Sequence, residues 1–186
     1  MAIDKVIAVH EAGHVVLSIH SGLGVASATI DRDKDSDGGI YYTRSSFWLV
    51  PYFDGKRPPL LVAPSRRAFV MAHLLSCWGG YAAEGLTFGK PSLTWRRSWD
   101  EHHAGICAKL LGCADVRAVV ASFREPAEAI LEAKRGELEA LTDALVRHRT
   151  LTGVDIRRIL ARHRAFVRAQ WDVARERARH ANGRSS

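Results

Sequence analysis

A stretch of apolar residues at positions 6–17, interrupted by three polar side chains, most constrains how this chain can fold. The interrupting residues are His10, Glu11 and His14, in the run Val-His-Glu-Ala-Gly-His-Val-Val. The valine, isoleucine and leucine residues on either side predict a helix from about residue 4 to residue 20 that is buried in the domain. His10 and His14 lie one turn apart on this helix and project from the same face. Burying both imidazoles requires partners for their nitrogens.

The spacing of the two histidines predicts a metal site. Imidazoles one helical turn apart can both reach one ion at about 2.0–2.1 Å. Glu11 points about 100° away round the helix, where its carboxylate can take a proton from a water molecule at the metal without binding the metal itself. This is the H-E-x-x-H arrangement of zinc metallopeptidases. The alternative is an exposed helix with two unrelated histidines, which the apolar flanks and the small Ala12 and Gly13 disfavour.

A catalytic zinc site has three protein ligands and leaves the fourth position to water. By spacing alone, the third ligand beside His10 and His14 could come from any of five later residues. These are Glu84, Asp100, Glu101, His102 and His103. One of the three cysteines is a less favoured candidate, because their odd number and the absence of a C-x-x-C pair indicate reduced, mostly buried thiols.

The composition is that of an ordinary globular protein, with 186 residues, of which 47% are hydrophobic and 25% charged. We expect a single domain over residues 1–178, whose C-terminal part from about 115 to 178 is helical, and a disordered tail at 179–186. The net charge of +7 permits contact with nucleic acid, anionic lipid or acidic protein without indicating any of them. No signal peptide and no apolar run suited to a membrane span is recognisable, so we expect a cytoplasmic protein.

Turn residues and hydrophobic periodicity predict a mainly α fold with a small β-hairpin or sheet. A short strand at 25–31 and a second at 40–43 flank a charged loop. The proline-rich residues 44–64 are expected to be irregular, and their aromatic side chains form either a cleft wall or a surface excursion. The helices expected further along the chain are 65–84, 99–111 with Ser98 as its cap, 126–146 with Pro126 as its first residue, and a last one from 152 onwards.

Four separated stretches resemble the peptidase domain of the FtsH family of AAA proteases. The first is the His-Glu-Ala-Gly-His motif itself, since that family favours alanine and glycine at the two variable positions. The second is Leu-Ser-Cys-Trp-Gly-Gly-Tyr-Ala-Ala-Glu-Gly-Leu-Thr-Phe-Gly at 75–89, the third is Ser98-Trp99-Asp100, and the fourth is 138–160. They follow the order found in that family and together span most of the first 160 residues.

The chain also departs from that family. Tyr81 stands in place of an arginine, Arg96 in place of a glycine and Trp99 in place of an asparagine. Neither a G-x-x-x-x-G-K-[ST] phosphate loop nor a membrane span is present, so the family's ATP dependence is not carried over. A separately encoded ATPase and a homo-oligomer both remain open as partners.

The resemblance implies an FtsH-peptidase-like helical zincin that holds Zn²⁺ through His10, His14 and Asp100. Glu11 would act as the base, and the isolated chain would hydrolyse peptide bonds in unfolded or flexible polypeptides without ATP. In the resembled family an edge strand near the zinc pairs with the substrate backbone. The matching substrate-binding residues here are Gly39, Ile40, Tyr41, Tyr42 and Thr43.

His103 is the main competitor of Asp100 as the third ligand. Ser98 as a cap would place Asp100 in the first turn of its helix, where a carboxylate is favoured, and Glu101 would then point about 100° away. His103 lies nearly one turn after Asp100 and shares its face. It could therefore bind the metal itself or orient Asp100 through a hydrogen bond.

Two other functions stand as alternatives to peptide hydrolysis. One is a catalytically degenerate FtsH-like domain that keeps the metal and the fold but serves as an adaptor or regulatory module; the intact Glu11 speaks against it. The other is nucleic-acid binding through the arginine-rich last helix. We do not expect nucleic acid as a partner, because such a pattern is more often a solvated basic face and aromatic residues for base stacking are missing.

Overall fold

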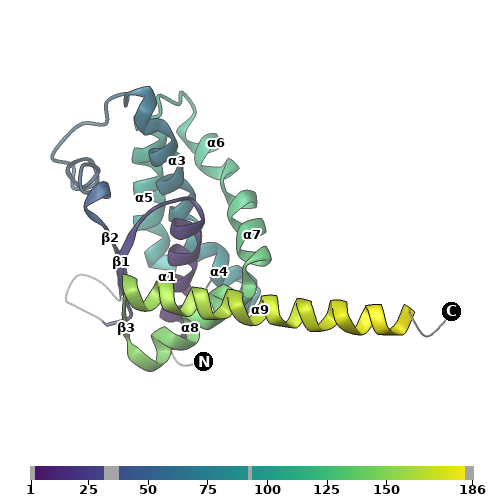
Figure 1. Cartoon of the computed structure of the whole chain (residues 1–186). Helices are drawn as coiled ribbons and strands as arrows, with labels where there is room; N and C mark the ends of the chain where they lie inside the picture. The colour runs from purple at the N-terminus through teal and green to yellow at the C-terminus, as the bar shows by residue number, and fades with distance from the viewer. Residues whose placement is uncertain (1–2, 32–37, 92–93, 183–186) are drawn as a thin grey trace.

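The computed structural model describes the backbone of residues 3–31, 38–91 and 94–182, and the side chains of these ranges apart from 94–98 and 171–182. It is mainly helical with one small antiparallel sheet, as the sequence predicts (Figure 1). The helices are α1 (Ile3–His20), α2 (Val50–Phe53), α3 (Pro64–Cys77), α4 (Gly79–Phe88), α5 (Thr94–Leu110), α6 (Val116–Ser122), α7 (Arg124–Ala133), α8 (Arg135–His148) and α9 (Gly153–Asn182), with a 3-10 turn η1 (Arg44–Ser46). The strands are β1 (Val25–Thr29), β2 (Gly39–Tyr42) and β3 (Thr150–Thr152).

Helix α1 runs through the middle of the body, where it packs against α3, α4, α8 and the sheet (Figure 1). Every residue from Val6 to Ser18 is buried. A helix that is apolar on nearly all faces is stable only when other elements surround it, and the expected burial of this helix is confirmed. As a consequence, His10, Glu11 and His14 lie inside the protein, with exposed fractions of 3%, 3% and 6%.

The crossing of α1 and α4 depends on glycine. A Cβ atom at Gly79 would lie 2.6 Å from the Cα of His14, and one at Gly13 would lie 2.6 Å from the Cβ of Ala83. The two backbones therefore approach more closely than any larger residue at these positions would permit. The small residues at these positions thus make a very close helix crossing possible. It brings α4 directly beside the two histidines of α1.

Strand β1 is the centre of the sheet, and β2 and β3 pair antiparallel on its two sides. Ala28 pairs with Ile40 of β2 and with Leu151 of β3. The expected antiparallel pair of β1 and β2 is confirmed, while residues 32–37 between them lie outside the described residues. The sequence did not predict the third strand, because three residues give little local signal and their partner strand lies far upstream. Thr29 and Thr150, for example, are 121 positions apart. Strand β2 is an edge of the sheet.

The single helix expected at 65–84 is wrong, because the structure divides it into α3 and α4. The backbone changes direction at Trp78, whose indole Nε1 donates a hydrogen bond to the carbonyl oxygen of Val120 at 2.8 Å. This change of direction lets α4 cross α1 at its glycines while α3 packs against α5.

The expected start of the following helix at Trp99 is also wrong. Helix α5 begins at Thr94, so Ser98 lies inside the helix and does not cap it. The connection between α4 and α5 is short, because α4 continues to Phe88. None of the residues between Thr94 and Ser98 is a helix breaker. Asp100 is therefore almost two turns from the start of α5 rather than in its first turn.

The C-terminal part is helical from about residue 115, as expected, but its divisions differ. The single helix expected at 126–146 consists of α7 and α8, which meet at Lys134, and α6 precedes them. The bend lets Leu131 of α7 and Leu138 of α8 both enter the core around α1. The tail expected to be disordered from residue 179 is helical as far as Asn182, and residues 183–186 lie outside the described residues.

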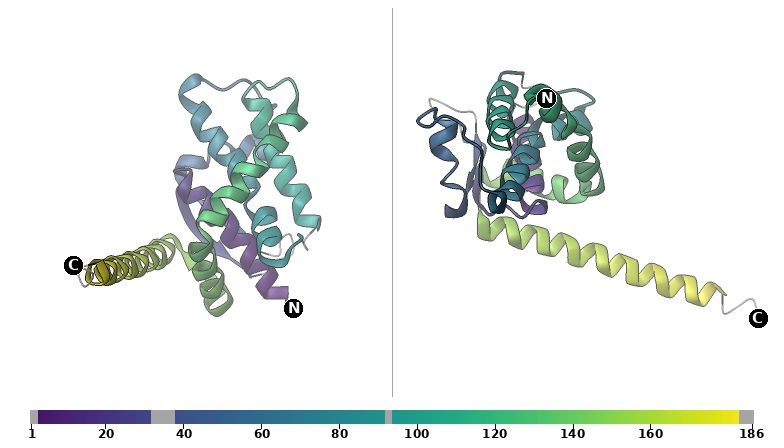
Figure 2. Two further views of the ribbon diagram at one scale, coloured as in Figure 1. Left: turned by 90° about the vertical axis from the view of Figure 1, so that its right-hand side faces the viewer. Right: turned by 90° about the horizontal axis from the view of Figure 1, so that it is seen from above.

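Helix α9 packs against α8 and the sheet, with Ile156 and Leu160 buried, and then extends away from the body (Figure 2). The described side chains form two hydrophobic clusters in the body. One surrounds α1 and includes residues of the sheet, α4, α7, α8 and α9. The other lies between α3 and α5 and includes Leu74, Cys107 and Leu110. The candidate site lies where α1, α4 and α5 meet.

Candidate metal centre

Three atoms that could bind a metal meet between α1 and α5. The Nε2 atoms of His10 and His14 are 3.1 Å apart, and Oδ2 of Asp100 is 3.4 Å from each of them. Ligands at about 2.0–2.1 Å from one tetrahedral zinc ion are themselves about 3.3–3.4 Å apart. Within residues 3–31, 38–91 and 99–170, these three form the one group of histidine, cysteine and acidic side chains with metal-like spacing.

In its neutral form, each of the two histidines directs an unprotonated nitrogen to the middle of this group. Nδ1 of His14 lies 2.7 Å from the backbone carbonyl oxygen of Ser76. Because a carbonyl oxygen only accepts, this Nδ1 carries the proton and donates. Nδ1 of His10 donates in the same way to the Glu84 carboxylate at 2.6 Å. In each neutral imidazole the remaining nitrogen, Nε2, therefore has a lone pair and no proton.

The carboxylate of Asp100 adds a third acceptor. Its Oδ2 is buried and has no hydrogen-bond partner among the described residues. Burial opposes ionisation, but the adjacent imidazoles of His14 and His10 outweigh burial and hold the pKa of Asp100 well below its usual range. Two lone pairs and a carboxylate oxygen converge here, which is unfavourable unless a positive charge lies between them. The donor set and the unpaired oxygen fit a divalent metal ion.

The charges around His10 lead to the same conclusion. Burial lowers the pKa of His10, but the carboxyl groups of Asp100, Glu84 and Glu11 outweigh burial and raise it to about 9. Three carboxyl groups close to two imidazoles make this a strongly negative, buried environment. Such an environment favours a cation, and a metal ion carries more charge into it than a proton does.

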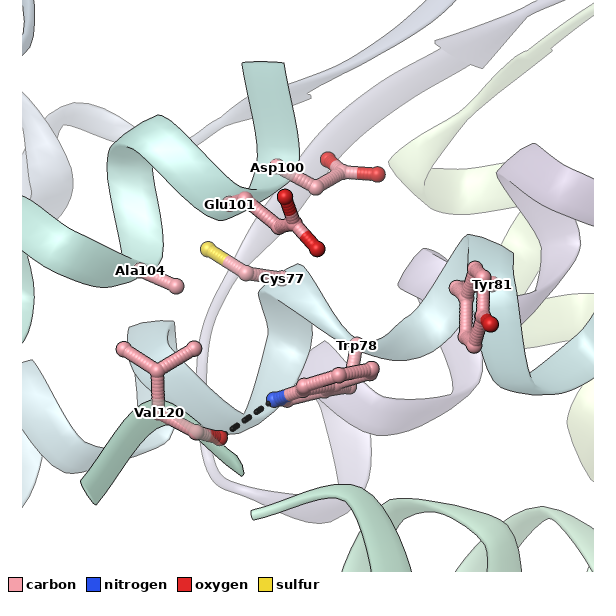
Figure 3. A pocket seen from close by; sticks show the side chains of 7 residues that line it. All are labelled: Cys77, Trp78, Tyr81, Asp100, Glu101, Ala104 and Val120. Carbon is pink, nitrogen blue, oxygen red and sulfur yellow. Dashed lines mark hydrogen bonds between the residues drawn. The ribbon is translucent and has the colours of Figure 1, made fainter. Parts of the chain in front are cut away.

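A small cavity of about 10 Å³, enough for one water molecule, lies beside Asp100. Figure 3 shows its wall, in which the carboxylates of Asp100 and Glu101 leave α5 in different directions. Cys77 also lines this cavity, and burial raises the pKa of its thiol well above the usual value. All three cysteines are free of disulfides, as expected. Neither Glu101 nor Cys77 belongs to the group of potential ligands.

The remaining candidates for the third ligand also lie outside the group. Glu84 holds the far side of the His10 ring, away from Nε2. His102 is exposed, and the ring of His103 stacks on Phe53 with its centroid 4.4 Å from the Phe53 centroid. Of the five candidates that sequence spacing leaves open, the structure brings only Asp100 to the two histidines.

An open cavity of about 750 Å³ begins at the candidate metal centre. His10, Glu11, His14 and Asp100 lie on its wall. Strand β2 lines one part of the cavity, and side chains of the segment after β2 and of α3 and α5 line other parts. These include Phe47, Val50, Phe53, His73, Trp99 and His103. Of the two interpretations of residues 44–64, the cleft wall holds for the part that contains Phe47 and Phe53. Trp48 and Tyr52 pack on the second hydrophobic cluster instead, and residues 54–61 are an exposed excursion.

Four of the five residues expected to contact a substrate line this cavity, namely Gly39, Ile40, Tyr41 and Tyr42. Thr43 is not part of the described wall. Strand β2 ends at Tyr42, and the backbone N–H of Thr43 donates to the carbonyl oxygen of Gly24 at 2.9 Å. The turn into η1 thus removes Thr43 from the strand edge.

Ser76 of α3 joins strand β2 to the metal centre, a role that the sequence does not reveal. Its backbone carbonyl accepts the hydrogen bond from His14, and its hydroxyl lies 2.9 Å from the hydroxyl of Tyr42 and 2.7 Å from that of Ser18. Burial raises the pKa of Tyr42, although hydrogen bonds from Ser18 and Ser76 oppose it, so Tyr42 is a neutral phenol. A carbonyl group is common to all residues, so no side-chain pattern could have indicated this contact.

Two further histidines lie on the cavity wall. Burial, with a smaller contribution from the neighbouring His103, lowers the pKa of His73 to about 4. Its Nε2 lies 3.3 Å from the hydroxyl of Ser46, as expected for a packed, hydrogen-bonded histidine. Burial also lowers the pKa of His103, and the opposing effect of Asp100 is smaller. Both imidazoles are therefore neutral at pH 7.

Comparison of the chain with protein-family models and with curated proteins finds no match. The resemblance to the FtsH peptidase domain thus depends on the motifs themselves and on the arrangement of their side chains. None of the described helices is long and apolar enough to cross a membrane.

Proposed function

We propose that this protein is a zinc-dependent metalloendopeptidase that cleaves unfolded or flexible polypeptides, with an FtsH-like peptidase fold. One observation carries the proposal. Two imidazole lone pairs and the unpaired Oδ2 of Asp100 converge beside Glu11, on the wall of an open cavity of about 750 Å³. A structural metal site would be closed by a fourth protein ligand, whereas a catalytic site keeps a position open.

His10, His14 and Asp100 would hold the ion, and Glu84 and the Ser76 carbonyl would keep both imidazoles in the metal-binding tautomer. When bound, zinc would polarise the peptide carbonyl and lower the pKa of the attacking water. Two histidines and one carboxylate also suit iron. The preference for zinc comes from the H-E-x-x-H motif, in which a glutamate follows the first histidine.

Glu11 would move the protons of the reaction. It is next to His10 in the chain and lies on the cavity wall, where it can accept a proton from the attacking water and deliver it to the leaving amine. The substrate backbone would lie along β2, whose outer edge is not occupied by another described strand of the sheet. Pairing through main-chain atoms explains how many unrelated sequences could bind, provided that they are extended.

The decisive experiment compares the wild-type chain with Glu11→Gln. The wild type should contain about one zinc per chain and cleave a fluorescently labelled unfolded polypeptide. A chelator and Glu11→Gln should each abolish cleavage, and Glu11→Gln should retain its zinc. Glu139→Gln is a matched control, because Glu139 is exposed on α8, and its activity should equal that of the wild type.

The opposite result would favour the adaptor function. Zinc bound at full occupancy with no cleavage of any unfolded substrate would show that the domain keeps the metal without the reaction. Iron in place of zinc, with metal analysis done on protein purified without added metal, would overturn the peptidase assignment.

A further inference from the structure

His103 lines the cavity together with the candidate ligands and Glu11, but it neither belongs to the ligand group nor acts as the proposed base. Its ring stacks on Phe53 with 4.4 Å between the centroids and 29° between the planes. Stacking fixes the plane of the imidazole. The described residues provide no hydrogen-bond partner for its nitrogens. An oriented imidazole on the wall of an open cavity therefore has N–H capacity for a bound molecule.

The other buried donors on this wall are already engaged. The hydroxyl of Tyr42 lies within hydrogen-bond distance of Ser76 and Ser18. Nε2 of His73 lies within hydrogen-bond distance of the hydroxyl of Ser46, and His73 is only 3% exposed. These groups hold the wall in place and are not available to a substrate without the loss of an internal hydrogen bond.

Tyr41 and Trp99 are exposed hydrogen-bond donors on the cavity wall, with exposed fractions of 55% and 61%. Trp99 directly precedes Asp100, so it points about 100° away from Asp100 round α5. His103 follows Asp100 by three residues and shares its face of the helix. Among these side chains, His103 alone combines the direction of the candidate ligand Asp100 with a half-buried, stacked ring.

We infer that His103 is a catalytic residue that donates an N–H hydrogen bond to the carbonyl oxygen of the scissile peptide bond as negative charge develops on it. The inference rests on the proposed hydrolysis. His103 keeps its proton throughout, and Glu11 carries the proton from water to the leaving amine. An imidazole has at least one N–H in either protonation state, so the assignment does not depend on its titration. Donors aimed at developing charge commonly contribute about 10²–10³-fold to kcat.

The test uses the full zinc-loaded chain and three variants. His103→Phe keeps a ring that can stack on Phe53 but removes the N–H. His103→Gln replaces the imidazole by an amide that can still donate. His102→Phe is the matched control, because it makes the same substitution at the exposed neighbouring position. Each is measured for zinc content, for kcat and KM with an unfolded polypeptide, and for affinity for a phosphinic peptide that mimics the tetrahedral intermediate.

We expect His103→Phe to lower kcat by about 10²–10³-fold, with KM and zinc content within about twofold of the wild type. Its affinity for the phosphinic peptide should fall in step with kcat/KM, because both report transition-state stabilisation. His103→Gln should recover a large part of the loss, and His102→Phe should behave as the wild type. A purely structural role would change KM, zinc content or folding instead.

Two results would overturn the inference. The first is an unchanged kcat in His103→Phe. The second is loss of zinc from His103→Phe or His103→Gln, which would make His103 a ligand. Failure of the proposed function has a different signature, namely a zinc-loaded wild type that does not cleave. In that case the phosphinic peptide still decides on His103, because its binding requires no turnover: equal affinity for wild type and His103→Phe would overturn the inference as well.

Discussion

Gly80 lies so close to the imidazole of His10 that a Cβ atom at position 80 would overlap the ring. The same helix, α4, supplies Glu84, which accepts the hydrogen bond from Nδ1 of His10. Two residues one turn apart on α4 therefore control this imidazole. Gly80 leaves room for the ring, and Glu84 determines which of its nitrogens carries the proton. The geometry of the candidate metal centre depends on the packing of α1 against α4 as much as on the candidate ligands themselves.

We predict that Gly80→Ala displaces His10. Alanine is the better helix former, but the overlap with the ring should outweigh this gain and destabilise the protein by about 1–3 kcal/mol. Zinc affinity, measured by calorimetric titration, should fall at least about tenfold. Gly85→Ala is the control on the same helix, because a Cβ atom there meets nothing within 4 Å. It should stabilise the protein by up to about 1 kcal/mol and leave zinc binding unchanged. Normal zinc affinity in Gly80→Ala would contradict the role of this contact.

A second prediction concerns the third ligand. Asp100→Ala should lose most of its zinc affinity, because it removes the carboxylate oxygen that lies 3.4 Å from both Nε2 atoms. His103→Ala should keep nearly normal affinity, because His103 stacks on Phe53 outside the ligand group. Metal content after dialysis against a weak chelator distinguishes the two. A loaded Asp100→Ala beside an empty His103→Ala would indicate a three-histidine site.

Glu84→Gln should weaken zinc binding without abolishing it. The amide oxygen can still accept from Nδ1 of His10, but the negative charge that strengthens the imidazole as a ligand is lost. Replacing such partners of metal-binding histidines commonly costs about 10–100-fold in affinity. The measurement is competition with a chromophoric zinc chelator. An affinity equal to that of the wild type would mean that Glu84 only fills space beside the ring.

Glu137 of α8 predicts a pH dependence of stability. Glu137 is 4% exposed, and its carboxylate accepts hydrogen bonds from Nε2 of His20 (2.8 Å) and Nε of Arg164 (3.1 Å). These two hydrogen bonds connect α8 to α1 and to α9. Burial opposes ionisation, but Arg164 and His20 outweigh burial and lower the pKa of Glu137 below its usual value. The ionised form is therefore favoured by folding, and its contribution is present above the unfolded pKa and lost as the pH falls through the folded pKa.

Glu137→Gln should accordingly destabilise the protein by about 1–3 kcal/mol at pH 7, measured by urea unfolding. The difference from the wild type should shrink as the pH is lowered below the ordinary range for glutamate. Glu139→Gln, at an exposed position on the same helix, should show no such difference. A constant difference between pH 7 and pH 3 would show that the carboxylate charge is not responsible.

The parts of the structure that sequence predicted well are those with local signals. Helix α1 was predicted nearly to its ends, because its run of apolar residues is long and Ser21-Gly22 follows it directly. Strands β1 and β2 were also predicted from local signals, because both flank a charged loop in the sequence. The predicted boundaries of helices and strands were wrong where tertiary packing determines where an element begins or ends. The break at Trp78 serves the approach of Gly79 to α1, and the three residues of β3 become a strand only by pairing with β1.

The candidate site divides in the same way. The H-E-x-x-H spacing alone identified His10 and His14, because both lie on one helix. Spacing could not choose between Asp100 and His103, which share a face of α5, and the expected cap at Ser98 was not the reason that Asp100 reaches the histidines. The contacts of Ser76 depend on a backbone carbonyl and a tertiary fold, which no spacing rule contains.

Ser76 has a consequence for how such a site can vary by mutation. Its carbonyl holds His14, and any residue at position 76 would supply the same atom. Its hydroxyl holds Tyr42 of β2, and only serine or a close relative can do this. A substitution at position 76 would therefore loosen β2, the proposed substrate strand, while the hydrogen bond that orients the candidate ligand His14 stays in place. If the proposed function holds, substrate preference could diversify at this position without loss of the metal.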